Sequence, residues 1–195
     1  MRLLVAFTFL VFLIGCDFEN PNKQVLEEAY LKADSISILI EDFPGDSIKS
    51  VRARLNSAKN EIQWLGNETS VEFFREEAPV INSLSSASRY LKDAPRRIIS
   101  LKYESDRCKK QITGLIDIID SGANIDAKGD TINDLYIENN SVIEVEAVKN
   151  LEEVYNETER LIRLGLKTDS IHWNSIDSLI TAKKGVWAKS IAKEE

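Results

Sequence analysis

Apolar residues recur every three or four positions through most of this chain, and this spacing constrains its fold more than any other feature. It places the apolar side chains on one face of an α-helix, and that face must pack against a partner helix. No segment alternates convincingly as a strand would, apart from a few residues around 132–137. The sequence therefore predicts an all-α fold, an antiparallel helical bundle of about five to six helices. The strictest stripe consists of Ile48, Val51, Leu55, Ala58, Ile62 and Leu65.

Leu55 lies in the middle of this stripe and is expected to be buried. Truncating a buried leucine to alanine costs about 2 to 5 kcal/mol of stability. Arg54 is expected on the opposite, solvated face, where its replacement by alanine should cost under about 0.5 kcal/mol. The contrast between these neighbours tests the helical register.

Breaking and capping residues divide the pattern into helices. Pro44 and Gly45 interrupt the helical spacing between a first stripe, over residues 25–40, and the second. Asp46 follows the break and is expected to cap the second helix. The connection is short, so we expect the first two helices to be antiparallel neighbours.

Four more helices are expected after residue 67. Pro79 should either kink the third or mark its true start, and Pro95 should open a fourth that ends near residue 119. Residues 121–134 are rich in Gly, Asp and Asn and predict a connection. A fifth helix should follow over 140–164, with a sixth capped by Thr168-Asp169.

The first 15 residues have the form of a bacterial export signal. Arg2 is followed by an uncharged stretch, residues 3–13, in which Thr8 is the only polar residue. A spanning helix needs roughly 20 apolar residues, whereas a secretory signal needs a basic start and a shorter apolar run. The stretch ends in Leu13-Ile14-Gly15-Cys16. This motif resembles the lipobox of bacterial lipoproteins.

The resemblance implies a mature protein anchored by lipid at Cys16. In bacterial lipoproteins the cysteine sulfur receives a diacylglyceryl group, the chain is cut before the cysteine, and the new amine is acylated with a fatty acid such as palmitate. The expected organisation is a signal peptide at 1–15, a lipidated cysteine with a short tether at 16–22, and one helical bundle domain at 23–195. We expect attachment to the inner or outer membrane of the cell envelope, facing the periplasm or the cell surface.

The net charge of the mature chain limits which classes of partner the protein can bind. Loss of Arg2 with the signal peptide leaves 24 basic and 32 acidic residues, a net charge of −8. Such a domain is repelled by phosphate backbones, so no nucleic acid partner is expected.

Cys108 is the only other cysteine and has no partner for a disulfide once Cys16 is lipidated. Arg107 favours a reactive thiolate there. The register with Leu101 and Ile112 instead favours a small buried apolar side chain.

Asp followed by Ser or Thr and then an aliphatic residue occurs five times, although composition alone predicts about 0.7 occurrences. The pattern resembles an O-glycosylation signal used on exported proteins by one large group of Gram-negative bacteria. The alternative is helix capping by Asp46, Asp130 and Asp169, which leaves Asp34 and Asp177 unexplained because they fall within predicted helices. The candidate acceptors are Ser35, Ser47, Thr131, Ser170 and Ser178.

The C-terminal run over 183–193 is basic and contains Trp187. Lysines near a helix C-terminus complement the helix dipole, and Trp187 is then expected to face the bundle. The alternative is that the run lies against anionic head groups.

No residue pattern for catalysis or for metal binding stands out. His172 is the only histidine, and with Asp169 it gives one carboxylate–histidine spacing where a di-iron bundle needs two. The loop over 124–135 lacks oxygen ligands at positions that an EF-hand requires. We therefore expect no cofactor, no metal and no enzymatic activity. The expected function is binding of another envelope component, with a small-ligand-binding bundle of the sensor or carrier type as the alternative.

Overall fold

The computed structural model describes residues 20–69, 71–126, 129 and 131–192. No strand occurs within these residues, which contain one isolated bridge between Ile125 and Thr131. The all-α prediction is therefore confirmed. The elements are α1 (Pro21–Glu41), α2 (Gly45–Glu68), a 3-10 turn η1 (Arg75–Glu77), α3 (Ala78–Leu91), α4 (Ala94–Ser121) and α5 (Asp134–Ile191).

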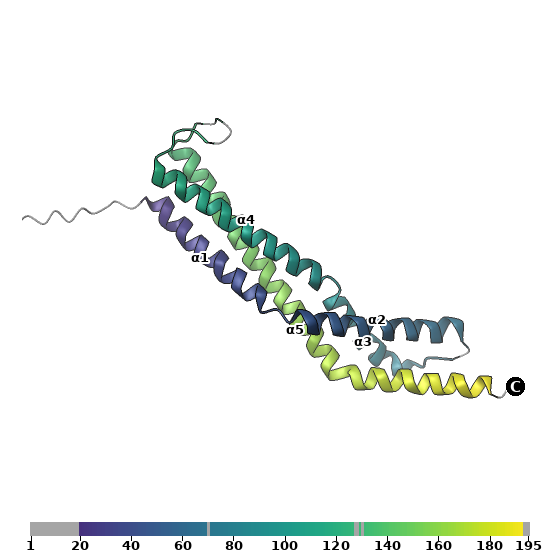
Figure 1. The fold of residues 1–195 in the computed structure, drawn as a ribbon. Coiled ribbons are helices and arrows are strands. Elements are labelled where there is room, and N and C mark those ends of the chain that lie inside the picture. Colours follow the sequence, from purple (N-terminus) through teal and green to yellow (C-terminus); the bar gives the residue numbers. More distant parts are fainter. Residues whose placement is uncertain (1–19, 70, 127–128, 130, 193–195) are drawn as a thin grey trace, which may run out of the picture.

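The helices form three long rods, of which only one is uninterrupted (Figure 1). α1 and α2 follow one another along the molecule, and α3 and α4 lead back in the opposite direction. α5 runs the whole length beside both rods and contains 58 residues. At 1.5 Å per residue this helix is about 87 Å long. The domain is accordingly elongated.

Two hydrophobic cores lie one after the other along α5. The first half of α5 shares a core with α1 and α4, and the second half shares another with α2 and α3. The largest side chains of the first core are Leu26, Ile36, Ile40, Leu101, Ile112, Leu115 and Leu151. Those of the second are Leu55, Leu84, Leu91, Ile176 and Ile180. A smaller cluster of Ile48, Ala94 and Ile162 lies between them.

The two broken rods are interrupted near prolines, as predicted. Pro44 precedes α2, and the residue before a proline is disfavoured in the helical region, so α1 ends shortly before it. Pro79 marks the start of α3 rather than a kink, and Pro95 lies in the first turn of α4. Both breaks lie at the level of Ile162, and α5 bends between the two bundles (Figure 1).

The arrangement of α1 and α2 differs from the prediction. They do not pack as an antiparallel pair, because α1 packs against α4 and α5 whereas α2 packs against α3 and α5. The apolar stripe of α5 is long enough to cover both helices in turn. The cap is also different, since Pro44 occupies the N-cap position of α2 and Asp46 lies in the first turn.

The predicted fifth and sixth helices are one continuous helix. Thr168 and Asp169 lie inside α5 and cap nothing. The polar side chain that suggested a helix start at residue 169 is instead directed into the bundle, where it is 2% exposed. The described residues thus contain five α-helices, the lower of the two predicted numbers. No helix in this part of the chain has the length and hydropathy of a membrane span.

Candidate functional sites

The proposed lipid attachment site, Cys16, lies outside the described residues, which begin at Asn20. Asn20 caps α1, because its side-chain oxygen accepts a hydrogen bond from the Asn22 amide at 3.0 Å. Lys23, in the first turn, forms a 2.7 Å ion pair with Asp120 at the end of α4. The start of α1 is therefore fastened to the domain. We call this end of the molecule the anchor end: it comprises the start of α1, the end of α4, the start of α5 and the described residues of the connection between α4 and α5, which are 122–126, 129 and 131–133 (Figure 1).

All five candidate O-glycosylation residues are exposed to solvent, but they do not form one site. They are spread over most of the domain, with Ser35 in α1, Ser47 in the first turn of α2, Thr131 in the connection before α5, and Ser170 and Ser178 within α5. Thr131 is the only one of the five outside an α-helix. Helix capping does not explain the pattern at two of its five positions, because neither Asp46 nor Asp169 is an N-cap. Asp130 lies outside the described residues.

The aspartates that precede these hydroxyls differ in accessibility. Asp169 is almost fully buried, and Asp34 forms a 3.3 Å ion pair with Lys109 of α4. Asp46 and Asp177 are exposed. An enzyme that reads the aspartate side chain of the folded protein would therefore reach Ser47 and Ser178 more readily than Ser170.

Asp169 belongs to a cluster that joins α2 to α5. The Arg54 guanidinium donates to both carboxylate oxygens of Asp169, with the Nε–Oδ1 bond at 3.2 Å. Its carbon lies 4.4 Å from the centroid of the Trp173 ring. The prediction that Arg54 lies on a solvated opposite face is therefore wrong. Neighbouring helix positions are about 100° apart, so a residue beside buried Leu55 lies at the edge of the interface.

His172 lies within α5 rather than at a helix start, and it is half-buried. Among the described residues, no three side chains of the His, Cys, Asp or Glu types gather in an arrangement that could hold a metal ion.

A second buried charge, Lys183, organises the end of the domain opposite the anchor end. Lys183 is 6% exposed, and its ammonium donates to the Glu72 carbonyl at 2.7 Å and pairs with Glu77 at 2.8 Å. It also lies 5.2 Å and 4.6 Å from the ring centroids of Phe73 and Phe74. These contacts hold the connection between α2 and α3 against α5.

Glu77 is stabilised in its charged form. Burial acts to raise its pKa, but hydrogen bonds from Lys183 and from the Phe74 amide, at 2.8 Å, outweigh burial and lower the pKa below 4.5. The ionised carboxylate is therefore part of the folded structure at neutral pH.

Four aromatic residues lie at this end of the domain, and two of them, Phe73 and Phe74, contact the buried lysine. Trp187 packs edge-on against Trp64 with ring centroids 4.7 Å apart, so it faces the bundle as predicted. Phe73 lies beside Gly66 of the same helix as Trp64. Phe74 and Trp64 are 58% and 38% exposed. We call Trp64, Phe73, Phe74 and Trp187 the far-end aromatic cluster.

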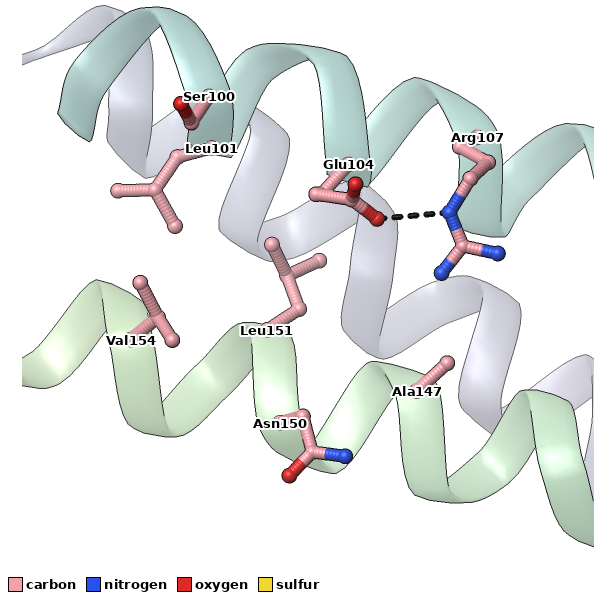
Figure 2. Close-up of a pocket in the computed structure, with 8 residues that line it drawn as sticks. All are labelled: Ser100, Leu101, Glu104, Arg107, Ala147, Asn150, Leu151 and Val154. Carbon is pink, nitrogen blue, oxygen red and sulfur yellow. Dashed lines mark hydrogen bonds and ion pairs between the residues drawn. The ribbon is translucent and has the colours of Figure 1, made fainter. Parts of the chain in front are cut away.

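A groove of about 290 Å³ lies between α4 and α5 in the bundle near the anchor end. Figure 2 shows its lining side chains: Ser100, Leu101, Glu104, Arg107, Ala147, Asn150, Leu151 and Val154. Most of its exposed surface is apolar, and the Arg107 guanidinium is paired with Glu104 at 2.7 Å. The groove is open at the surface of the bundle. It therefore lacks the enclosed pocket with converging polar groups that would favour a small ligand.

Two buried polar atoms of α5 have no hydrogen-bond partner among the described residues, Ser141 Oγ and Glu144 Oε2. Glu144 is 8% exposed, and burial raises its pKa although Arg107 opposes the effect. Burial also raises the pKa of the Cys108 thiol, which is 1% exposed. Cys108 is thus a buried side chain without thiolate activation, and the prediction made from its helical register is confirmed.

The buried charges on α5 were missed at the sequence level, although the pattern contains a signal for them. Ile162, Asp169, Ile176 and Lys183 are each seven residues apart, and this spacing returns to the same face of a helix. Two charges in such a series indicate buried ion pairs rather than a cap or a solvated lysine. Comparison of the chain with protein families, with curated proteins and with solved structures found no match.

Proposed function

We propose that this chain is a lipid-anchored lipoprotein of the bacterial envelope whose noncatalytic helical domain binds another envelope component at the end far from its anchor. The proposal depends on one observation: the lipobox-like motif and the exposed aromatic residues belong to opposite ends of one elongated domain. The lipobox-like motif precedes the start of α1, whereas the exposed members of the far-end aromatic cluster lie near the opposite end of α5.

The far-end aromatic cluster has the chemistry of a protein-binding surface. Tryptophan and other aromatic residues are enriched in the centre of interfaces, where they contribute most of the binding energy. Phe74 and Trp64 expose aromatic surface, and Lys183 holds the chain just before Phe74 by donating to the Glu72 carbonyl. Such an exposed apolar surface favours a protein partner over a small ligand.

The anchor is tested with Cys16→Ser in the producing bacterium. The variant should incorporate no labelled palmitate, and it should either retain its signal peptide or be released from membranes. A correctly cleaved Cys16→Ser protein that stays in the membrane fraction would contradict the proposal, because no helix of the described residues is long and apolar enough to span a membrane.

Partner binding is tested with a photoreactive residue at position 74 in intact cells. A cross-linked product should form there and should be lost when Trp64 is replaced by alanine. The matched control is position 103, because Tyr103 of α4 is also an exposed aromatic residue, at 69%, but lies in the other bundle. Equal cross-linking at both positions, or none at position 74, would refute the far-end interface.

A small-ligand-binding function is the second candidate. The observation that favours it is the largely apolar groove between α4 and α5 shown in Figure 2. Under this alternative, Val154→Trp would fill the groove, because Val154 lines it and is 47% exposed, and would abolish ligand-dependent stabilisation of the purified domain. The same variant should leave cross-linking at position 74 unchanged.

We also propose O-glycosylation at one or more of Ser35, Ser47, Thr131, Ser170 and Ser178. Their exposure supports modification of the folded protein, and Thr131 is the one candidate that lies outside the α-helices. Mass spectrometry of protein purified from its own membranes would show added sugar at these residues. Thr131→Ala should remove the modification at that site, and an unmodified protein would refute the idea.

A further inference from the structure

We propose that the anchor end contacts a zwitterionic lipid surface through Ile125 and Leu135, and that the rest of the domain projects away from the membrane. This inference rests on the proposed lipidation of Cys16. It adds a second, noncovalent membrane contact and an orientation, neither of which the lipid anchor requires.

The first argument is the length of chain between the lipid and the domain. α1 begins at Pro21, five residues after Cys16. An extended chain spans at most 3.3 to 3.6 Å per residue, so this tether reaches no farther than about 18 Å. The ion pair between Lys23 and Asp120 then holds the end of α4 within a similar reach. The anchor end cannot leave the vicinity of the bilayer.

The second argument is what this end exposes. Ile125, in the connection after α4, is 65% exposed, and Leu135, in the first turn of α5, is 62% exposed. Both positions are structurally defined. Ile125 pairs with Thr131 across the isolated bridge, and the Asn133 side chain caps α5 by accepting from the Tyr136 amide at 2.9 Å. Two large aliphatic side chains are therefore presented where a lipid surface must lie.

The charges at this end select the kind of lipid. Asp126 and Asp134 lie next to Ile125 and Leu135 in the chain, whereas Asp120 at the end of α4 is already paired with Lys23. Carboxylates are repelled by anionic head groups, in contrast to the lysine-rich segments that bind such membranes. The contact thus fits a neutral, zwitterionic surface into whose interface apolar side chains insert.

The arrangement of the native tryptophans allows a direct test. Trp64, Trp173 and Trp187 all lie in α2 or in the second half of α5, away from the anchor end. The full lipidated protein is reconstituted into phosphatidylcholine vesicles with bromine-substituted acyl chains, which quench tryptophan fluorescence on contact. New tryptophans are introduced as Ile125→Trp and Leu135→Trp. The matched control is Val142→Trp, because Val142 is 64% exposed and lies two turns beyond Leu135, about 10 Å along α5.

We expect the greater part of the added emission to be quenched for Ile125→Trp and Leu135→Trp. Val142→Trp should be quenched less, and the native tryptophans should be unaffected. Replacing part of the phosphatidylcholine by phosphatidylglycerol should weaken the quenching. Strengthened quenching with that lipid would contradict the zwitterionic surface.

Two other results would overturn the inference in different ways. Quenching of the native tryptophans would show that the domain lies along the membrane. Vesicle flotation separates the remaining possibilities. Protein that floats without quenching at 125 and 135 refutes the lipid contact but leaves the anchor standing, whereas protein that does not float refutes the anchor and the contact together.

Discussion

Replacing Gly165 by alanine should destabilise the domain, whereas the same replacement at Gly185 should stabilise it. Both glycines lie within α5, but only Gly165 is buried. A Cβ atom at Gly165 would lie 2.4 Å from Leu91 Cγ and 2.7 Å from its Cδ2, and 3.2 Å from Tyr90 Cβ. The closeness of α3 to α5 at this point therefore depends on the missing side chain.

The magnitudes follow from two opposing effects. Alanine is more favourable than glycine in a helix interior by about 0.8 to 1.0 kcal/mol. At Gly185 no atom lies within 4 Å of a new Cβ, so the full gain should appear. At Gly165 the fully buried Leu91 must move, and overpacking a core costs about 1 to 3 kcal/mol. The two variants should thus differ by about 1 to 3 kcal/mol.

Urea denaturation followed by circular dichroism measures both variants. A double-mutant cycle with Leu91→Ala assigns the cost, because Gly165→Ala should become favourable once the leucine side chain is gone. The coupling energy should equal the overpacking cost, about 1 to 3 kcal/mol. Equal stabilisation by Gly165→Ala and Gly185→Ala would refute the close packing of α3 on α5, as would additivity in the cycle.

Four further substitutions test the buried polar groups and the core. Leu55→Ala should cost about 2 to 5 kcal/mol of unfolding free energy, and Arg54→Ala about 1 to 3 kcal/mol because it leaves the Asp169 carboxylate buried without its partner. Glu144→Gln should raise stability at pH 7 by up to about 1 to 3 kcal/mol, since it removes a buried charge whose Oε2 atom lacks a hydrogen bond. Glu77→Gln should lower stability by about 1 to 2 kcal/mol at pH 7.

The pH dependence of the last two has opposite signs. Burial raises the folded-state pKa of Glu144 above the ordinary value of 4.5. The charge therefore destabilises the folded state at neutral pH, and this penalty disappears as the pH falls to about 4.5. The folded-state pKa of Glu77 is lowered, so its contribution is present above about 4.5 and is lost as the pH falls through the folded value. Denaturant titrations at pH 7 and pH 4 distinguish these cases. If the benefit of Glu144→Gln did not shrink at pH 4, the prediction for Glu144 would be contradicted. If the penalty of Glu77→Gln were the same at both pH values, the prediction for Glu77 would be contradicted. If Arg54→Ala cost under about 0.5 kcal/mol, the interpretation that Arg54 lies on a solvated face would be correct after all.

Local rules in the sequence predicted helix type and most helix breaks. The apolar stripe through Leu55 is buried as its spacing indicates, and Pro44, Pro79 and Pro95 each mark a helix start. These features depend on residues within one turn of each other. Periodicity and proline geometry therefore suffice to identify them.

Local sequence rules could not predict which helices pack together or which distant side chains pair. A short connection after Glu41 permits either a hairpin or a continuing rod, and only the length of α5 decides between them. Asp169 satisfies the local signature of a cap, yet Arg54, distant in sequence, supplies its partner inside the bundle. The attachment site at Cys16 lies outside the described residues, so its prediction still depends on the motif alone.

The continuity of α5 also determines how the domain should melt. Starting a helix is costly because several residues must be ordered for the first hydrogen bond, whereas extending one is not. While either bundle is folded, its half of α5 provides the other half with a helix that is already nucleated at Ile162. Loss of one core therefore weakens the other through the shared backbone, although the two cores are separate clusters of side chains. A substitution such as Leu55→Ala should lower protection from hydrogen exchange in α1 and α4 as well as in α2 and α3.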